Sequence, residues 1–120
     1  MPTLKTLQAF ADTVEANDHV GAIVNFYAPT ARTQENNGEW RVGREALAAR
    51  ESAVLASVAS VKTTRLGPLM HDGDHSAICW RFEFTGKDGT VRSMEEVAWQ
   101  TWRGDELIEE RFFYDPQQMR

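Results

Sequence analysis

The chain is poor in the residues that mark several protein classes. It has one cysteine, Cys79, among 120 residues, which excludes an internal disulfide and a cysteine-rich zinc site. Lys and Arg total 13 against 18 Asp and Glu, and they form no basic stripe of the kind a nucleic-acid surface needs. No apolar run approaches the roughly 18 residues of a membrane span, and Met1–Lys5 lacks the order of a signal peptide. We therefore expect a cytoplasmic protein with neither nucleic acid nor membrane as a partner.

The first half of the chain carries apolar residues at helical spacing. With 42% hydrophobic residues, the sequence can build a core, and its length fits one domain over residues 1–120. The spacing predicts helices over Leu4–Val14, Val20–Tyr27 and Arg44 to about Ala59. Asp18 is suited to cap the second helix and Pro29 to end it.

Between the second and third predicted helices lies a hairpin signal. Asn37-Gly38 separates two short extended runs, Arg32–Glu35 and Glu39–Val42. A two-residue turn at this dipeptide places Trp40 opposite Glu35.

From residue 60 onward the hydrophobic period changes to two, which is typical of strands. The predicted strands are Val61–His71, Ser76–Thr85, Thr90–Trp102 and Leu107–Tyr114. A helical half followed by a four-strand meander favours the α+β class.

The turns predict which residues share a face of the sheet. We take Asp88-Gly89 and Gly104-Asp105 as two-residue turns and pair the strands accordingly. Three cross-strand rows result on the predicted inner face: Phe82–Glu95–Tyr114, Trp80–Val97–Phe112 and Ile78–Trp99–Glu110. The outer face then holds Arg81 opposite Glu96, together with Cys79, Met94, Ala98, Trp102, Arg111 and Phe113.

Two glutamates, Glu95 and Glu110, fall on this otherwise apolar face. Either they reach water at the rim of the sheet, or the face lines a cavity with polar tips. The aromatic residues of the same face fit both a core and a cavity wall.

The order helix, helix, hairpin, helix and meander resembles that of the nuclear transport factor 2-like superfamily. The segments Phe26-Tyr27-Ala28, Gly43–Leu47, Met94–Gln100 and Leu107–Pro116 are similar to its SnoaL-like branch. The resemblance implies a cone-shaped α+β fold, with a strongly curved, mostly antiparallel sheet wrapped around three helices and one internal pocket. Members include ketosteroid isomerase, limonene epoxide hydrolase, scytalone dehydratase and polyketide cyclases, and others that only bind ligands or proteins.

The resemblance also implies roles for single residues. Glu35, counted from Tyr27-Ala28, matches the position of the isomerase base, and Tyr114 matches a ring beside that base. The two oxyanion donors of the isomerase fall at or next to Phe10 and on Val97, which predicts that its mechanism is absent. The hydrolase's charged residues fall near Ile78 and Trp80 and on Phe112, so its constellation is absent as well.

We therefore predict Glu35, Glu95 and Tyr114 as catalytic residues. Predicted ligand-binding residues are Trp40, Ile78, Trp80, Phe82, Val97, Trp99, Glu110 and Phe112, with no metal and no organic cofactor. Alternatives remain open, because Glu35 can equally be a solvated strand-end residue and Tyr114 an ordinary sheet-end aromatic. The histidines His19, His71 and His75 lie in predicted loops or strand ends without metal-ligand spacing.

Three functions fit these features. The first is a SnoaL-like enzyme that acts on a small hydrophobic molecule by isomerisation, cyclisation, dehydration or hydrolysis, with carboxylates as acid and base. The second is a ligand-binding module with the same pocket and no turnover. The third is an interaction scaffold that uses the outer sheet face. Related folds dimerise through that face, so we expect a homodimer with Phe113 in or near the interface.

Overall fold

The order of helices and strands follows the change of period along the chain. The computed structural model describes residues 1–119 of this protein. Its elements are α1 (Leu4–Glu15), α2 (His19–Phe26), β1 (Tyr27–Glu35), β2 (Arg41–Val42), α3 (Arg44–Ala56), β3 (Ser60–Arg65), β4 (Met70–Asp72), β5 (His75–Thr85), β6 (Val91–Arg103), β7 (Glu106–Phe113) and the 3₁₀ helix η1 (Pro116–Met119). The α+β class is confirmed, and the predicted strand from residue 61 is divided into β3 and β4.

Polar side chains fix where the first two helices begin. The Thr3 hydroxyl accepts a hydrogen bond from the Thr6 amide at 3.1 Å, and α1 follows directly. The Asp18 carboxylate accepts from the Gly21 amide at 2.9 Å, so the predicted cap of α2 is confirmed. The helix ends at Phe26 rather than Tyr27, and Tyr27 opens β1 instead. This one-residue difference matters below, because it points the phenol of Tyr27 into the molecule.

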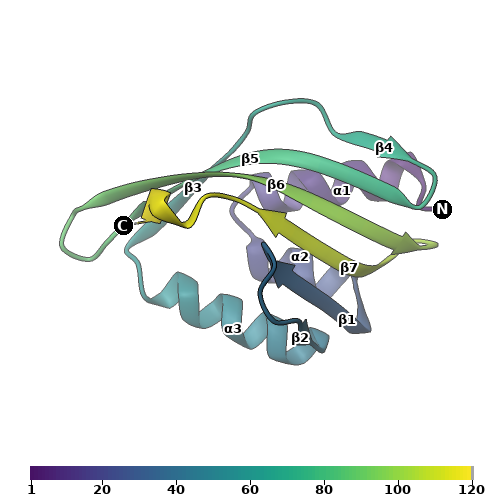
Figure 1. Cartoon of the computed structure of the whole chain (residues 1–120), viewed down its shortest axis with the longest axis horizontal. Coiled ribbons are helices and arrows are strands. Elements are labelled where there is room, and N and C mark those ends of the chain that lie inside the picture. The colour runs from purple at the N-terminus through teal and green to yellow at the C-terminus, as the bar shows by residue number, and fades with distance from the viewer. Residues whose placement is uncertain (120) are drawn as a thin grey trace.

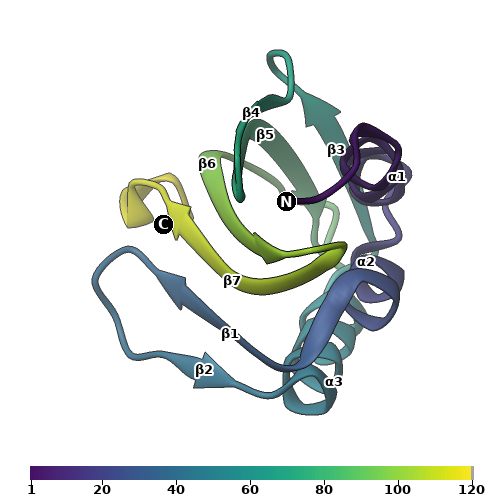
Figure 2. The same ribbon diagram turned by 90° about the vertical axis from the view of Figure 1, so that its right-hand side faces the viewer.

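The strands form one open, mixed sheet that curls around its own inner face. Neighbouring strands follow the order β2-β1-β7-β6-β5-β3, with β4 also paired to β5. The pairing of β1 with β7 is parallel, and the other pairings are antiparallel. Seen along the strands, the sheet is strongly curved, with α2 and α3 beside one of its edges and α1 next to β3 (Figures 1 and 2). The concave face and the helices therefore enclose the interior.

The predicted pairing of β5 with β6 is wrong by one residue. Trp80 pairs with Glu96, and Arg81 with Glu95, rather than with Val97 and Glu96. The turn is longer than predicted, because the Gly86 amide donates to the Thr90 carbonyl at 2.8 Å and leaves three residues in the loop. Its last residue, Gly89, has φ +87°, which matches a three-residue hairpin that ends in a left-handed position.

The predicted pairing of β6 with β7 is also wrong by one residue, for a different reason. The two-residue turn at Gly104-Asp105 is present, and Trp102 pairs with Leu107 as its geometry requires. Between Thr101 and Trp102 the register then shifts, so that Gln100 pairs with Glu110. Such a bulge adds one residue to one strand and changes which side chains share a face beyond it.

The two shifts together decide which set of alternate side chains on β6 faces the interior. Its buried side chains are those of Glu96, Ala98, Gln100 and Trp102. Val97 and Trp99, predicted inside, are 43% and 41% exposed on the convex face, and Glu95 is exposed there as well. Ala98 and Trp102, predicted outside, belong to the core with Leu7, Phe10, Ile78 and Trp80.

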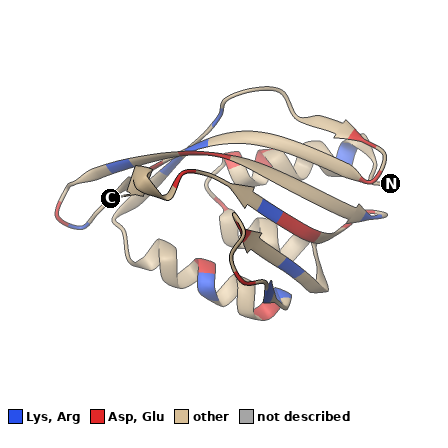
Figure 3. Cartoon of the chain, viewed as in Figure 1, with Lys and Arg blue, Asp and Glu red and all other residues tan. Residues whose placement is uncertain are grey.

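Charge on the surface is mixed. Acidic and basic residues alternate along the strands and on α3 (Figure 3), and several are paired, such as Arg81 with Glu95 and Arg32 with Glu109. Among the residues described, no helix is both long and apolar enough to cross a membrane.

Candidate active site

A cavity of about 210 Å³ lies between the helices and the concave face of the sheet. Most of its wall is apolar, which suits a small molecule with little polarity. The apolar wall includes Phe10, Ile23, Leu47, Trp80, Phe82, Phe84, Met94 and Phe112. The polar lining residues are His19, Tyr27, Thr33, Glu35, Arg41, Arg50, Glu51, Glu96 and Glu110. The carboxyl groups among them differ sharply in their surroundings.

Glu35, at the end of β1, has its carboxylate held by three side chains. The Tyr114 hydroxyl donates to it at 2.9 Å, the Arg41 guanidinium at 2.5 Å, and Arg50 lies 3.5 Å away. Partial burial alone would raise the pKa of Glu35, but the hydrogen bonds from Arg41 and Tyr114 and the two positive charges outweigh it. The pKa of Glu35 is therefore lowered, and the group is ionised at neutral pH.

This environment corrects one expectation and supports another. Trp40 does not bury Glu35. The β1–β2 register pairs Arg41 with Thr33, two residues before Glu35, and the Arg41 guanidinium binds the Glu35 carboxylate. The Trp40 ring instead stacks on the Arg32 guanidinium, 4.0 Å from its centre. The predicted hydrogen bond from Tyr114 to Glu35 is present, and burial together with this bond raises the pKa of Tyr114 to about 12. Tyr114 thus stays a phenol and orients the carboxylate.

Glu110, on β7, also lines the cavity and is buried. One of its carboxyl oxygens accepts a short hydrogen bond from the Tyr27 hydroxyl, and the other accepts from the Gln100 amide at 2.7 Å. Burial raises the pKa of Glu110 to about 7, although both hydrogen bonds favour the ionised form. Burial and the carboxylate also raise the pKa of Tyr27 well above its usual range. Both the ionised and the protonated form of Glu110 are therefore accessible near neutral pH.

A chain of hydrogen bonds continues from Glu110 into the core. The Gln100 carbonyl accepts from the Ser76 hydroxyl at 2.6 Å, and the Ser76 oxygen accepts from the Trp102 indole N–H at 2.9 Å. All three side chains are buried. An indole nitrogen can only donate, so the Ser76 oxygen accepts from Trp102.

Glu96, on β6, lines the cavity without a partner. Its side chain is 7% exposed, and within residues 1–119 no hydrogen bond or ion pair reaches its carboxyl. Burial first, and then the negative charges of Glu110, Glu35 and Glu51, raise the pKa of Glu96 well above its usual range. These surroundings favour the protonated form of Glu96, whose O–H faces the cavity.

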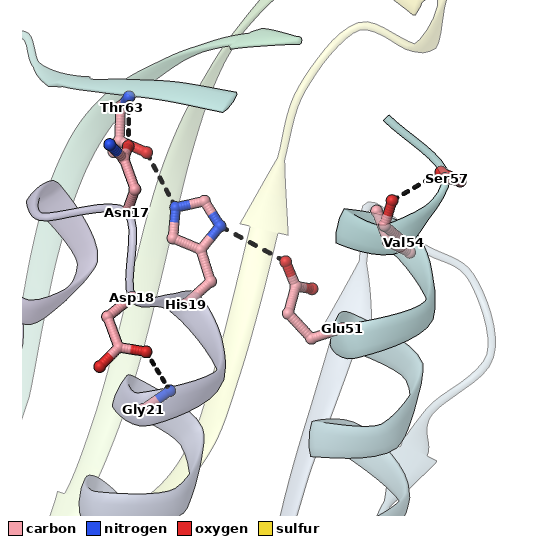
Figure 4. A network of polar contacts seen from close by, with 8 residues as sticks. All are labelled: Asn17, Asp18, His19, Gly21, Glu51, Val54, Ser57 and Thr63. Carbon is pink, nitrogen blue, oxygen red and sulfur yellow. Dashed lines mark hydrogen bonds and ion pairs between the residues drawn. The ribbon is translucent and has the colours of Figure 1, made fainter. Parts of the chain in front are cut away.

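His19 and Glu51 meet between α2 and α3 (Figure 4). One ring nitrogen of His19 lies 2.8 Å from the Thr63 hydroxyl, and the other lies 3.4 Å from the Glu51 carboxylate. The ring packs edge-on against Phe82, with the ring centres 5.3 Å apart. Asn17 holds β3 in place for this contact, because its side chain accepts from the Thr63 amide at 2.9 Å. His19 is a fixed part of the cavity wall, whereas it was predicted to lie in a surface loop.

The predicted site residues divide into those the cavity brings together and those it does not. Glu35, Trp80, Phe82, Glu110 and Phe112 line the cavity, and Tyr114 contacts it through Glu35. Ile78 faces the same side but is buried in the core without lining the cavity. The placement of Glu95, Val97 and Trp99 in the pocket is wrong, since all three point to the convex face.

Sequence reasoning missed Glu96, Tyr27, His19 and Glu51. Glu96 was missed only through the slipped register, because an adjacent carboxylate was assigned its place. Tyr27 and His19 sit at the two ends of α2, where a shift of one residue changes the direction of a side chain. No signal in the sequence joins His19 to Glu51, which is 32 positions away. Within residues 1–119, no group of three or more His, Cys, Asp or Glu could hold a metal ion.

Comparisons with known proteins agree with this architecture. The profile of the SnoaL-like domain family matches residues 7–110. A protein from Mesorhizobium loti assigned as a SnoaL-like polyketide cyclase superposes with a TM-score of 0.76 at 25% identity, covering 92% of this chain and 97% of that one. A similarly assigned protein from Jannaschia gives 0.80 at 12% identity, covering 96% and 89%.

A third structure, from Catenulispora acidiphila, is a hypothetical protein with a ketosteroid isomerase-like fold in complex with trimethylamine. It gives a TM-score of 0.78 at 19% identity, covering 97% of this chain and 89% of that one. None of the curated proteins matches the sequence significantly. The predicted resemblance in fold is confirmed.

Proposed function

The chain belongs to the SnoaL-like domain family, and from that premise we propose that it is a small-molecule enzyme that uses carboxylate acid–base chemistry on a largely apolar substrate. Isomerisation and cyclisation are the reaction types that suit it best. One observation carries the proposal. One largely apolar cavity holds a carboxyl group whose pKa is lowered, Glu35, and another whose pKa is raised by burial, Glu96. Environments that drive two carboxyl groups apart in pKa are how a site assigns a base and an acid.

Glu96 fills the role of acid that was predicted for Glu95. A carboxylic acid kept neutral by burial can donate its O–H to a substrate oxygen that gains negative charge in the transition state. The sequence comparison had put this donor position on Val97 and implied that the donor was missing. The observed register removes that objection, because the residue facing the cavity next to Val97 is Glu96.

Glu35 is the base in this proposal. It takes a proton from a carbon next to a substrate carbonyl, and the C–H electron pair moves toward the carbonyl oxygen, to which Glu96 donates. In a β,γ-unsaturated ketone, Glu35 returns the proton to the γ-carbon while the enol O–H gives its proton back to Glu96, which yields the conjugated isomer. In a dicarbonyl compound, the enol carbon attacks the second carbonyl, whose oxygen takes the proton from Glu35 as the enol O–H gives its proton back to Glu96, which yields a ring. Tyr114 and Arg41 hold the Glu35 carboxylate in position. No step requires a group that these residues do not supply.

A ligand-binding module without turnover is the second candidate, and one observation favours it. Two arginines and a phenol stabilise the charge of Glu35, which weakens it as a base. The cavity would then hold its ligand through Glu96 and the apolar wall alone.

The test uses the exchange of carbon-bound protons for solvent deuterium, followed by NMR over a panel of enolisable ketones. Adjacent glutamates on opposite faces of β6 supply matched variants, Glu96→Gln inside and Glu95→Gln outside. We expect Glu96→Gln to lower kcat about 100-fold or more, with KM changed little. Glu95→Gln should stay within about twofold of the wild-type protein, as a surface substitution away from the site does.

Three results decide between the candidates. Full exchange activity in Glu96→Gln would contradict the proposed acid. Normal activity in Glu35→Gln would contradict the proposed base. Binding of the ketones without exchange by the wild-type protein would favour the binding module.

A further inference from the structure

When Glu110 is ionised, its carboxylate and the Tyr27 oxygen present hydrogen-bond acceptors to the cavity. Both residues line the cavity. The Tyr27 proton is engaged by Glu110, so the phenolic oxygen has only lone pairs left for a ligand. The Glu110 carboxylate has the same character, since each of its oxygens already accepts one bond and can accept another.

The buried hydrogen-bond chain fixes this polarity. Trp102 donates to the Ser76 oxygen, and the Ser76 hydroxyl in turn donates to the Gln100 carbonyl. The Gln100 NH₂ group is thereby turned toward Glu110, where it can only donate. In this arrangement both neighbours, Tyr27 and Gln100, donate to the carboxyl, so its oxygens act as acceptors.

The basic side chains of the wall are already engaged. Arg41 and Arg50 both bind Glu35. The two ring nitrogens of His19 face Thr63 and Glu51. The carboxyl of Glu96 is more than nine-tenths buried, lines the cavity and has no partner within residues 1–119. What the cavity lacks at this end is a positively charged donor.

We propose that the Glu110–Tyr27 end of the cavity is a subsite for a protonated amine, which it recognises through these acceptor oxygens while the aromatic wall holds the rest of the molecule. The amine subsite extends the proposed enzymatic function by naming a substrate class. It rests on that function only in using the same cavity. An ammonium group both donates hydrogen bonds and supplies the missing charge. The rings of Phe10, Trp80 and Phe82 suit an apolar or aromatic body next to it.

Binding of a cation has a predictable pH dependence. The groups that face Glu110 are Tyr27, Gln100, Glu96, Glu51 and His19, from β1, β6, α3 and α2. Because burial and like charges raise the pKa values of Glu110 and Glu96, an arriving cation favours the loss of their protons. Affinity should rise from pH 6 to pH 8, with protons released to the buffer.

Three probes of nearly equal size test the subsite by calorimetry: benzylammonium, benzyl alcohol and benzoate. We expect benzylammonium to bind about tenfold or more tightly than benzyl alcohol, in line with a hydrogen bond to a charged group, and benzoate to bind most weakly. Glu110→Gln should abolish the preference for the cation. The matched control Glu95→Gln, an exposed glutamate on the other face, should retain it.

A second measurement needs only the wild-type protein, so the proposal can be tested even if the Glu110→Gln variant folds poorly. Heats of benzylammonium binding in two buffers of different ionisation enthalpy should show net proton release at pH 7. Equal affinity for the three probes, a preference for benzoate, or proton uptake would each overturn the amine subsite. Loss of ketone exchange in Glu96→Gln is a separate result, so the acid–base proposal and the amine subsite can fail independently.

Discussion

Glu95 and Glu96 are neighbours in the chain whose carboxyl groups lie on opposite sides of the sheet. Glu95 is exposed and pairs with Arg81, at 3.2 Å between the nearest nitrogen and oxygen. Glu96 is buried against the cavity, where its charged form lacks both water and a counter-ion. Two residues of the same type therefore differ in ionisation because alternate residues of a strand face opposite sides.

The raised pKa of Glu96 makes a prediction about stability. A carboxyl whose pKa is higher in the folded than in the unfolded protein binds more protons when folded, so stability falls as pH rises through that interval. Glu96→Gln removes this penalty. We expect the variant to match the wild-type protein near pH 4 and to melt at least about 4 °C higher at pH 8. Thermal unfolding across pH checks this, and Glu95→Gln should show no such divergence.

Glu35 gives the opposite pH dependence of stability, because its pKa is lowered in the folded protein, in part by the hydrogen bond from Tyr114. Its ionisation contributes stability at neutral pH that is lost as pH falls through the lowered pKa. Tyr114→Phe removes one of the hydrogen bonds that lower it, so the pKa of Glu35 should rise toward its ordinary value. For this partly exposed carboxylate we expect a loss of roughly 1 kcal/mol at pH 7. A carboxyl-carbon NMR titration of Glu35 with no change in the variant would contradict the assigned contact.

Among the secondary-structure elements, the β5–β6 hairpin sets which face of β6 lines the cavity. Its three-residue loop needs a left-handed residue before β6 begins, and Gly89 supplies it with φ +87°. A Cβ at Gly89 would meet no atom within 4 Å, so any cost of substitution there comes from the backbone alone. A substitution at Gly89 therefore tests the backbone conformation of the turn without disturbing side-chain packing.

Gly89→Ala should therefore destabilise the protein by about 1–2 kcal/mol, the cost of a left-handed conformation in a residue with a Cβ. Gly67→Ala is the matched control, because Gly67 also has open space around it and lacks a positive φ. We expect that change to be neutral or mildly stabilising. Urea unfolding of both variants measures the difference, and equal free energies of unfolding would show that the loop does not depend on Gly89.

At the scale of the whole molecule, an apolar patch remains on the convex face of the sheet. We define the convex patch as Val97, Trp99 and Phe113, which are 43%, 41% and 40% exposed. Val97 and Phe113 are paired across β6 and β7, while His75 stacks on Trp99 and Arg111 lies over Phe113. Exposed apolar groups gathered in this way are typical of an interface.

We propose that this patch joins two copies of the chain, as expected from the sequence for Phe113. Light scattering at micromolar concentration should give twice the monomer mass of 13.6 kDa. Trp99→Lys should yield the monomer, because it puts a charge in the centre of the patch. Val91→Lys, at an exposed valine outside the patch, should remain dimeric. A monomeric wild-type protein would contradict the proposal.

The sequence by itself determined the helices, most strand limits and the inner faces of β5 and β7. These depend on local chemistry, such as the Asp18 cap, the alternation Trp80–Phe82 and the alternation Glu110–Phe112. The Tyr114–Glu35 contact also followed from the resemblance in sequence. Each of these features could be predicted because the residues that decide it lie close together in the chain or match a family pattern.

Only the tertiary structure decided the face of β6 and the partners inside the cavity. Both faces of β6 mix apolar and charged residues, with Glu96 and Ala98 on one side and Glu95 and Val97 on the other, so alternation cannot choose between them. A longer loop on one side and a bulge on the other shifted β6 by one residue against both neighbours, and the two errors agreed with each other. The contacts of His19 with Glu51 and of Arg41 with Glu35 form only when the sheet curls around the helices, because no local pattern specifies which distant charge a side chain will meet.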